Sequence, residues 1–426
     1  MKRVFISTAA RRKSKFRPES PSLTKKVRDS TATKEETPNL PALPAGRRTG
    51  GVFIKGVYQT AFGELWDQSF GDLLVEAGQG ALKEARVEPE EIEAVYVGSM
   101  LAERVVEQGH LGAFLSSQLG MNCPAVRIEA ACASGGLAVR EGFLGLLSGE
   151  YQTVLVAGVE KMTDACSPEV TSGLMGATNG EEGAHGFTFP AIYALMAKAY
   201  QDEYGLSERE LAAVAVKNHY HGSLNEKAHY QKAISLKEAM TSEMICEPLR
   251  LFDCSGITDG AAAVILSRKK GSVEILGSGV ATDSLTLSGR KKFFSLAATQ
   301  GAMAKALKMA EIRREAIDLA EVHDCFTIAE IMALEDLGFY ERGKGKRVAL
   351  RGESYFNGKL PVNPSGGLKA CGHPVGATGV KQIVEVVNQL QGKAGKRQVK
   401  KARVGLCHNV GGSGGTAVVH LLGKTN

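Results

Sequence analysis

The stretch ALKEARVEPEEIEAVYV, residues 81–97, returns in altered form as ALKMAEIRREAIDLAEV, residues 306–322. Both copies begin with Ala-Leu-Lys, continue with apolar residues at matching positions and end in a short apolar run. Each copy predicts the end of a helix, a turn, a short helix and a strand. A repeat of this kind indicates that the chain contains two similar units in tandem.

The similarity continues on both sides of the quoted stretch. Before it, VFIKG at 52–56 matches VEILG at 273–277, and both predict a first strand. After it, each unit continues with a Gly-rich turn, a helix and a strand, over residues 135–158 and 376–406. Strands that alternate with amphipathic helices are typical of a layered α/β fold. We therefore predict a duplicated α/β fold, with halves at 49–271 and 272–426.

Two segments do not follow the repeat. Residues 164–250 contain a Gly-rich stretch and amphipathic patterns at 192–204 and 208–217, so we expect an inserted loop domain that covers a site. Residues 1–48 hold 13 Lys and Arg, 4 Asp and Glu, and five of the 13 prolines. This composition, with few large apolar residues, predicts a disordered basic arm.

Deletion of residues 1–48 is expected to leave folding and activity unchanged, because this arm offers too little apolar surface to join a core. Thermal unfolding and activity of the truncated protein, measured beside the full chain, check this. A truncated protein that aggregates or loses activity would contradict the prediction.

Composition excludes several classes of function. Apolar residues make up 43% of the chain, yet no apolar run approaches the roughly 20 residues that span a bilayer. The net charge of +6 comes from the basic arm, and the chain has one Trp, so nucleic-acid binding is not expected. Eight cysteines without C-x-x-C pairs favour a reducing compartment, the cytoplasm. The acid-poor start, which carries Arg and Ser, leaves the mitochondrial matrix as the alternative.

Cys132 is the first candidate for chemistry. It lies in VRIEAACASGG, residues 126–136, where a strand-like run ends and a turn of small residues opens a helix. The N-terminus of a helix stabilises a thiolate, so this position predicts a pKa below the usual value of about 8.5. The N–H groups there can also hold an oxyanion. The alternative is a buried structural cysteine.

Three further segments place reactive side chains at matching points of the two halves. His373 lies on the loop GLKACGHPVGATG, residues 367–379, where it could take a proton from a thiol. His323 and Cys325 belong to HDCF at the end of a predicted strand, and CHN, residues 407–409, ends the last strand. Because open α/β sheets bind ligands at strand ends, we expect these segments to converge on Cys132.

Taken together, these motifs resemble the thiolase superfamily over residues 51–422. The resemblance rests on C-x-S at Cys132, SGITDGAAA at 255–263, HDCF at 323–326, NPSGG at 363–367 and GHPVGATG at 372–379. HDCF makes the chain most similar to sterol-carrier-protein-2-type thiolases and to archaeal and bacterial acetyl-CoA acetyltransferases. The resemblance implies a five-layered α-β-α-β-α fold.

The resemblance also implies roles for individual residues. Cys132 would be the acylated nucleophile, His373 would activate it, and His323 would help to hold the enolate oxygen. Many thiolases take an acid/base cysteine from a C-x-G motif near the C-terminus, which would be Cys407 here. In the HDCF branch Cys325 takes that role, and Cys407 becomes a core residue. The remaining expected contacts are the backbone N–H groups of Cys132 and Gly411 in an oxyanion hole and substrate contacts by Ser255, Met196 and His408.

The implied function is that of an acetyl-CoA C-acyltransferase, which condenses acetyl-CoA or cleaves 3-ketoacyl-CoA by thiolysis. Acyl-CoA thioesters would be its substrates, no metal or redox cofactor is expected, and the chain should form a homodimer or homotetramer. One alternative is a decarboxylating ketoacyl-thioester synthase, which His408 and Asn409 would suit and Cys325 would not. The other is a non-catalytic acyl-CoA-binding protein, which should have lost its reactive residues. His219, His221 and His229 have metal-like spacing, but we expect them on the solvated surface.

Overall fold

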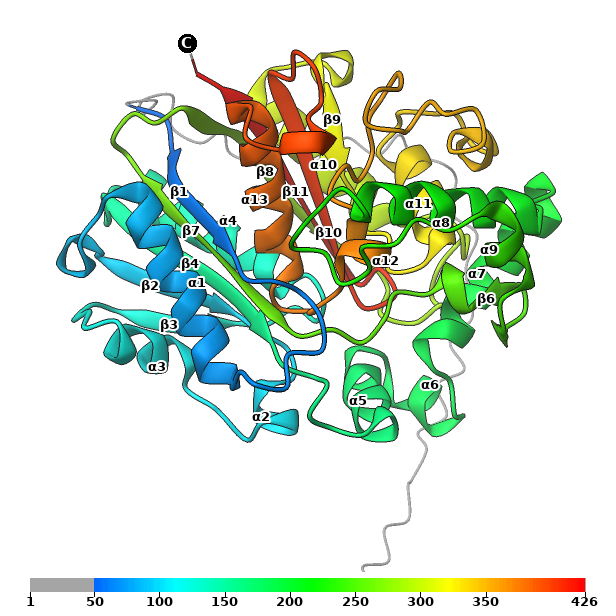
Figure 1. Ribbon diagram of the computed structural model, residues 1–426, viewed down its shortest axis with the longest axis horizontal. Coiled ribbons are helices and arrows are strands. Elements are labelled where there is room, and N and C mark those ends of the chain that lie inside the picture. Colours follow the sequence, from blue (N-terminus) through cyan, green and yellow to red (C-terminus); the bar gives the residue numbers. More distant parts are fainter. Residues whose placement is uncertain (1–49, 426) are drawn as a thin grey trace, which may run out of the picture. The chain divides into compact units, whose positions relative to one another are not determined.

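The computed structural model describes residues 50–425, and the predicted N-terminal arm lies outside them. The described residues form one nine-stranded sheet in the order β3-β2-β4-β7-β1-β8-β11-β10-β9 (Figure 1). Its strands are β1 Phe53–Gln59, β2 Ala94–Gly98, β3 Ala125–Ile128, β4 Thr153–Glu160, β7 Gly260–Ser267, β8 Val273–Thr282, β9 Leu319–Glu321, β10 Val404–Gly411 and β11 Thr416–Lys424.

The sheet consists of two halves. In the first, β2 pairs parallel with β3 and β4, while β7 pairs antiparallel with β4 and β1. In the second, β9 and β10 are parallel, and β11 pairs antiparallel with β10 and β8. Strands β1 and β8 join the two halves of the sheet, where Phe53 pairs with Glu274 and Ile54 with Val273.

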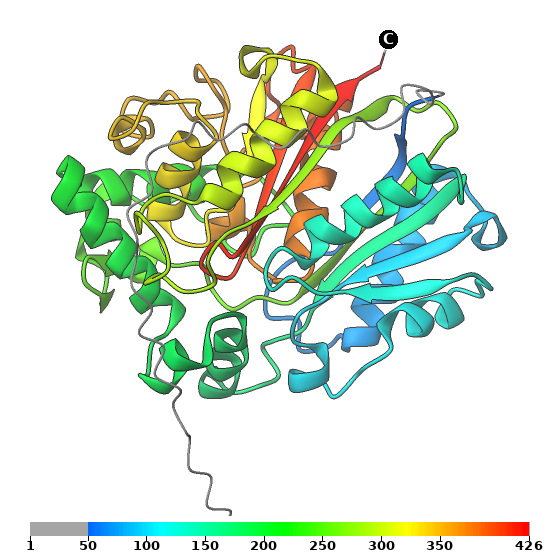
Figure 2. The ribbon, with the colours of Figure 1, turned by 180° about the vertical axis from the view of Figure 1, so that it is seen from behind.

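Helices cover both halves and fill the space between them. The main ones are α1 Phe70–Ala85, α3 Leu111–Gln118, α4 Ser134–Ser148, α10 Ala297–Ala310, α11 Thr327–Asp336 and α13 Thr378–Gln391. Helices α1 and α3 pack on the first half and α10 on the second, while α4 and α13 contact each other between the halves (Figures 1 and 2). The layers therefore run α-β-α-β-α, which confirms the predicted fold.

The repeat that opens the sequence is visible in the backbone. Helices α1 and α10 are each followed directly by a residue with a φ of 55°, Arg86 in one copy and Glu311 in the other. A short 3-10 helix follows each of them, Pro89–Glu91 and Arg314–Ala316, and then β2 or β9. A left-handed residue other than glycine is uncommon, so its return at the same point of both copies supports the duplication.

Alternate residues of the central strands belong to different layers. In β7, Ala261, Ala263 and Ile265 join the apolar cluster under α1 and α3. The intervening residues of β7, among them Ala262 and Val264, join the cluster around α4 and α13. Because side chains alternate along a strand, a strand buried on both faces must be apolar throughout, as this one is.

The inserted segment lies between β4 and β7 and gathers on one side of the described residues (Figures 1 and 2). It contains α5 Ser167–Leu174, α6 Gly180–Ala184, α7 Phe189–Tyr204, α8 Glu208–Gly222, α9 Leu236–Thr241 and the hairpin of β5 Met244–Cys246 and β6 Leu249–Arg250. Both predicted helices are present, as α7 and α8. Its Tyr193 stacks on Phe326 with ring centroids 4.6 Å apart, which holds the segment against the HDCF motif.

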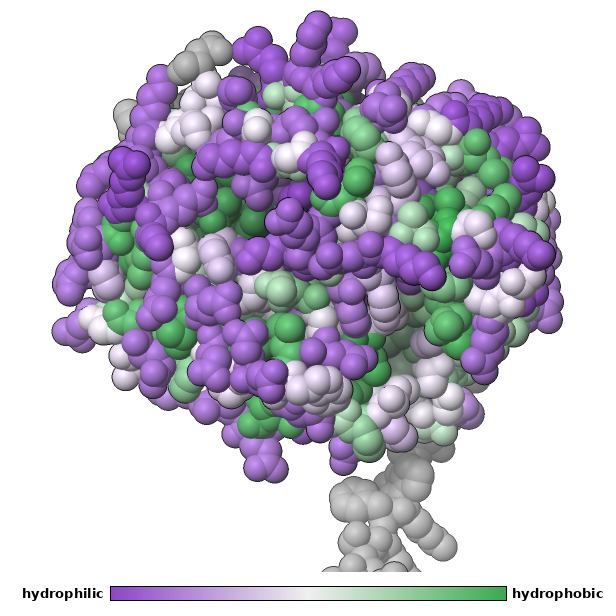
Figure 3. Space-filling view, viewed as in Figure 1, coloured by the Kyte–Doolittle hydropathy of each residue, from purple (hydrophilic) through white to green (hydrophobic). Residues whose placement is uncertain are grey.

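The described residues show neither a membrane-spanning helix nor, on the face drawn in Figure 3, a large apolar patch. Over residues 50–425, no helix combines the length and the apolar character that crossing a bilayer requires. The face in Figure 3 is mostly hydrophilic, with small scattered apolar patches.

Candidate active site

Cys132 lies in a tight turn between β3 and α4. Ala131 has a φ of 51°, and Ser134 Oγ accepts a hydrogen bond from the Ala130 N–H at 2.9 Å and donates one to the Ala131 carbonyl. The serine of C-x-S therefore stabilises the turn rather than taking part in the chemistry. The turn presents the Cys132 side chain at the start of α4.

The GHPVGATG loop packs directly on this turn. A Cβ atom added at Gly376 would lie 2.5 Å from the Val159 carbonyl oxygen and 2.7 Å from that of Gly98, so only glycine fits. The buried carboxylate of Glu160 accepts hydrogen bonds from the N–H groups of Gly376, Met100 and Leu101, at 2.9 to 3.0 Å. These contacts fix the loop and bring His373 beside Cys132.

His323 follows β9, and two side chains fix the backbone around it. Asn363 Oδ1 accepts a hydrogen bond from the Val322 N–H at 2.8 Å, and Asp324 accepts one from the Leu368 N–H at 2.6 Å. The NPSGG and HDCF motifs therefore hold each other in place. Together they direct the His323 ring toward His373.

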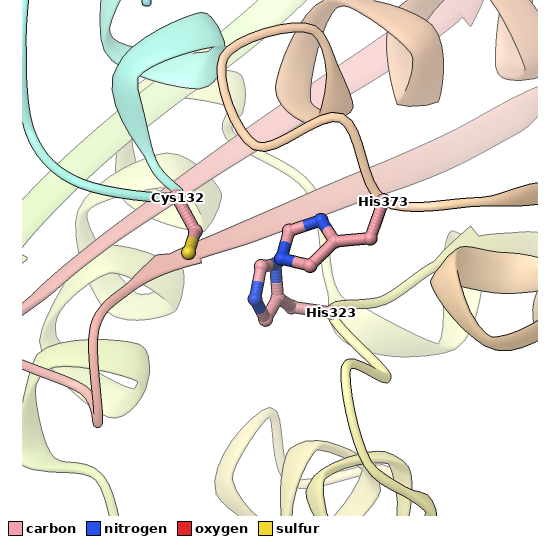
Figure 4. A group of neighbouring side chains, drawn as sticks. All are labelled: Cys132, His323 and His373. Carbon is pink, nitrogen blue, oxygen red and sulfur yellow. The ribbon is translucent and has the colours of Figure 1, made fainter. Parts of the chain in front are cut away.

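Cys132, His323 and His373 form one cluster (Figure 4). One Sγ or ring nitrogen from each lies within 4.8 Å of the other two, and all three side chains are buried. The histidine rings stand edge to face at 85°, with centroids 5.1 Å apart. Within residues 50–425 no other three His, Cys, Asp or Glu side chains approach one another closely enough to bind a metal ion.

The cluster opens into a cavity of about 210 Å³. Cys325 and Ser255 also line this cavity, together with the backbone of Gly412. Much of the remaining wall is apolar and includes Met162, Leu174, Phe189, Ile257, Phe326 and Val375. The cavity therefore offers three thiols, those of Cys132, Cys254 and Cys325, two imidazoles and a mainly apolar wall to a small organic group.

Burial controls the ionisation of Cys132. It raises the pKa of the thiol to about 12, although the N–H groups of Gly412 and of Cys132 itself lower it. The prediction that the helix N-terminus gives a pKa below the usual value is therefore wrong for the free protein, because desolvation outweighs the N–H groups. The thiol is protonated at pH 7 and needs a base.

The position of His373 beside Cys132 allows it to act as that base. Burial, and then the charge of Lys381, lower its pKa to about 3, so the ring is neutral at pH 7. Its Nδ1 lies 2.7 Å from Thr378 Oγ1, and that hydroxyl donates its proton to the Pro374 carbonyl. The hydroxyl must therefore accept from Nδ1–H, which leaves Nε2 without a proton and able to take one from Cys132.

Cys325 is another thiol of the cavity. Burial raises its pKa well above the usual value, while a hydrogen bond from Tyr193 lowers it. The Tyr193 hydroxyl also lies 3.2 Å from the Gly412 carbonyl oxygen, to which its single proton can be donated only when it is not donated to Cys325. The N–H of Gly412 faces Cys132. Tyr193 thus contacts both parts of the site. The sequence offered no signal for it, because it lies in the inserted segment.

Three expected contacts are not among the cavity-lining residues. The first is Gly411, because the N–H that faces Cys132 belongs to the next residue, Gly412. The second is Met196, which is buried in the large apolar cluster that also contains α11 residues. His408 Nε2 lies 2.9 Å from Thr299 Oγ1 of α10, because the strand alternation turns it away from the cluster. Cys407 is buried among the apolar residues around α13.

Asn409 reaches the site instead of His408. Its Oδ1 accepts a hydrogen bond from the Gly136 N–H at 3.1 Å, and its Nδ2 donates to the Cys132 carbonyl at 2.9 Å. Strand alternation requires His408 and Asn409 to point to opposite faces, but it does not say which of the two faces Cys132.

The other histidine group behaves differently from the expectation. His219 and His221 are buried rather than solvated. His221 Nε2 accepts a hydrogen bond from the Phe356 N–H at 3.1 Å, and its Nδ1 lies 2.9 Å from the Asn363 carbonyl oxygen. This ring therefore supports the loop before NPSGG, and the expected surface position was wrong.

Comparisons with known proteins agree with this geometry. The family model "Thiolase, N-terminal domain" matches residues 52–270, and "Thiolase C-terminal domain-like" matches residues 279–424. An acetyl-CoA acetyltransferase of Methanothermobacter thermautotrophicus is 46% identical over 382 residues, 88% of this chain and 99% of its own. Human sterol carrier protein 2 is 32% identical over 395 residues, 87% of this chain and 71% of its own.

Solved structures share the fold at lower identity. An Ltp2-ChsH2(DUF35) aldolase has a TM-score of 0.75 at 21% identity, covering 88% of this chain and 98% of its own. Human mitochondrial 3-ketoacyl-CoA thiolase has a TM-score of 0.69 at 19% identity, covering 88% and 99%.

Proposed function

This chain belongs to the thiolase family, and from that premise we propose that it is an acetyl-CoA C-acyltransferase with Cys132 as its acyl carrier. It transfers an acyl group between thioesters and forms or breaks the carbon–carbon bond of a 3-ketoacyl-CoA. The observation that carries the proposal is the cavity itself, where Cys132, Cys325, His323 and His373 meet.

Acylation comes first. His373 Nε2 takes the proton of Cys132, and the thiolate attacks the carbonyl carbon of an acyl-CoA. The N–H groups of Cys132 and Gly412 hold the oxyanion, so we assign to Gly412 the role first expected of Gly411. The intermediate collapses to acyl-Cys132, and the departing coenzyme A thiolate takes the proton of Cys325.

The carbon–carbon bond forms next. The Cys325 thiolate, stabilised by the Tyr193 hydroxyl, removes an α-proton from a second acetyl-CoA. His323 and the protonated His373 hold the enolate oxygen while its carbon attacks acyl-Cys132. The Cys132 thiolate leaves and recovers its proton from His373, so every group returns to its starting state. Thiolysis is the reverse.

A direct assay tests the function. With acetoacetyl-CoA and free coenzyme A, the protein should form acetyl-CoA, and the cavity volume favours short acyl groups over longer 3-ketoacyl-CoAs. A decarboxylating synthase should instead consume a malonyl thioester with release of CO₂, and a non-catalytic binder should do neither. Absence of thiolysis with every chain length would contradict the proposal.

The remaining roles follow from position. We assign the contact with the pantetheine arm to Ser255, which lines the cavity, and we no longer assign substrate contacts to Met196 and His408, which do not. The reaction needs no metal or redox cofactor, because thiols and imidazoles carry every proton. We propose two domains, the halves at residues 49–271 and 272–426, with the inserted segment at 164–250 as a loop domain of the first. Eight cysteines without a disulfide suit the cytoplasm.

A homodimer, or a dimer of dimers, is expected to form along β3. The edge of β9 is covered, because Ala320 exchanges backbone hydrogen bonds with Pro361 and Asn363. Strand β3 ends the sheet on the other side, and Val126 is 46% exposed there. An uncovered strand edge favours pairing with a second copy of the chain, and a charged side chain on that edge opposes the pairing.

Val126→Lys should therefore lower the mass measured by light scattering at micromolar concentration, whereas Leu350→Lys, at a similarly exposed residue, should not. A monomeric wild-type protein with full activity would overturn the expectation.

A further inference from the structure

The two histidines of the cluster meet different partners through Nδ1, the Thr378 hydroxyl for His373 and the Asn409 side-chain amide for His323. Burial, and then the neighbouring His373 and His408, lower the pKa of His323 well below the usual range, so its neutral ring carries one proton. Which nitrogen carries this proton decides whether the ring donates a hydrogen bond into the cavity or offers a lone pair there.

Backbone groups fix the orientation of the Asn409 amide. The Gly136 N–H can only donate, so it must face Oδ1, and the Cys132 carbonyl can only accept, so it must face Nδ2. Both contacts are buried, at 3.1 and 2.9 Å. A flipped amide would place like groups against each other at both positions.

The same NH₂ group faces His323. Asn409 Nδ2 lies 3.2 Å from His323 Nδ1, and because the amide nitrogen can only donate, Nδ1 must accept. The ring proton therefore lies on Nε2. This Nε2 is buried and has no hydrogen-bond partner. A buried N–H without a partner costs free energy unless a ligand atom completes it.

We infer that Asn409 is a positioning residue that holds His323 as the Nε2–H tautomer, so that the cluster receives a thioester or enolate oxygen and does not act as a metal site. The series of hydrogen bonds from Gly136 through Asn409 to His323 therefore ends in a donor, the Nε2–H of His323, in the cavity wall. The donor set Cys132, His323, His373 would otherwise suit Zn²⁺, which binds imidazole only through a bare nitrogen. The inference rests on the proposed function only for the identity of the oxygen that is bound.

Asn409→Asp should reverse this arrangement. A carboxylate at 409 still accepts from Gly136 but can only accept from His323, which moves the ring proton to Nδ1 and leaves Nε2 bare. The affinity for Co²⁺, used as a coloured probe for Zn²⁺, should rise about 10- to 100-fold, as changes in the partners of metal ligands typically produce. Turnover should fall about 10²- to 10³-fold through loss of one oxyanion donor.

The experiment has three arms. In wild-type protein with ¹⁵N-labelled histidine, NMR should show His323 protonated at Nε2 and His373 at Nδ1. Absorption titration with Co²⁺ should give a thiolate-to-cobalt band in Asn409→Asp that is lost when Cys132→Ser is added. Asn179→Asp, the same change at the N-cap of α6, where a carboxylate can still accept from Glu181 N–H, should behave like wild type in both measurements.

The outcomes separate the two proposals. A wild-type His323 protonated at Nδ1 overturns the inference, as does a folded Asn409→Asp variant whose Co²⁺ affinity is unchanged. If the variant does not fold, the wild-type tautomers still decide. If His323 is protonated at Nε2 and His373 at Nδ1 but the protein has no thiolase activity, the inference about Asn409 stands and the proposed function is wrong.

Discussion

Cys132→Ala is expected to abolish covalent acylation and turnover together. The N–H groups of Cys132 and Gly412 face the Cys132 thiol. The other two thiols of the cavity have different contacts, since Cys325 contacts Tyr193 and Cys254 donates to the Arg250 carbonyl at 3.5 Å. Loss of a nucleophile that acts with a base commonly lowers turnover by about 10⁴-fold or more. The measurements are the thiolysis rate and the intact mass after mixing with acetyl-CoA.

The wild-type protein should gain the mass of one acetyl group, and a peptide map should place it on Cys132. Cys123→Ala, the same substitution outside the cavity, should acylate and turn over like wild type. An acetyl adduct that persists in Cys132→Ala would assign the nucleophile to another residue.

Cys325→Ala should separate the two half-reactions. Acylation of Cys132 remains possible, because His373 and the oxyanion N–H groups are intact. The carbon–carbon step loses its acid/base group and should slow by about 10²- to 10⁴-fold. Acetyl-Cys132 should then accumulate in the intact mass spectrum while acetoacetyl-CoA is formed slowly.

Cys407→Ala is the matched control, since this thiol is also buried but lies in the apolar core around α13. It should cost about 1 kcal/mol of stability and leave turnover unchanged. If Cys407→Ala were the inactive variant and Cys325→Ala turned over normally, the acid/base role would belong to Cys407, as in thiolases with a C-x-G motif.

The duplicated fold could be predicted because its pattern is local. Residues 81–97 and 306–322 repeat the same apolar periodicity, and both copies turn at a left-handed residue, Arg86 or Glu311. Periodicity and turn chemistry act over a few residues, so the sequence records them directly. Convergence of the motifs was predictable for a similar reason, because each follows a strand at an equivalent point of its half.

The register at the last strand was not predictable. Strand alternation requires His408 and Asn409 to point to opposite faces of β10. Only the way that β10 packs, with α10 on one face and α13 on the other, decides which of the two side chains meets Cys132. His408 therefore contacts Thr299, while Asn409 enters the site. The same limit explains why the N–H that faces Cys132 is that of Gly412, one residue after the expected Gly411.

The sequence by itself determined the two-unit architecture and the kinds of groups in the site, because these depend on local patterns and side-chain chemistry. Only the tertiary structure decided how those groups behave. Burial reverses the effect of the helix N-terminus and raises the pKa of Cys132 to about 12. Thr378 and Asn409 then place the protons of His373 and His323 on opposite nitrogens. The physical reason is that desolvation and hydrogen-bond direction depend on neighbours distant in the chain, and folding alone brings them together.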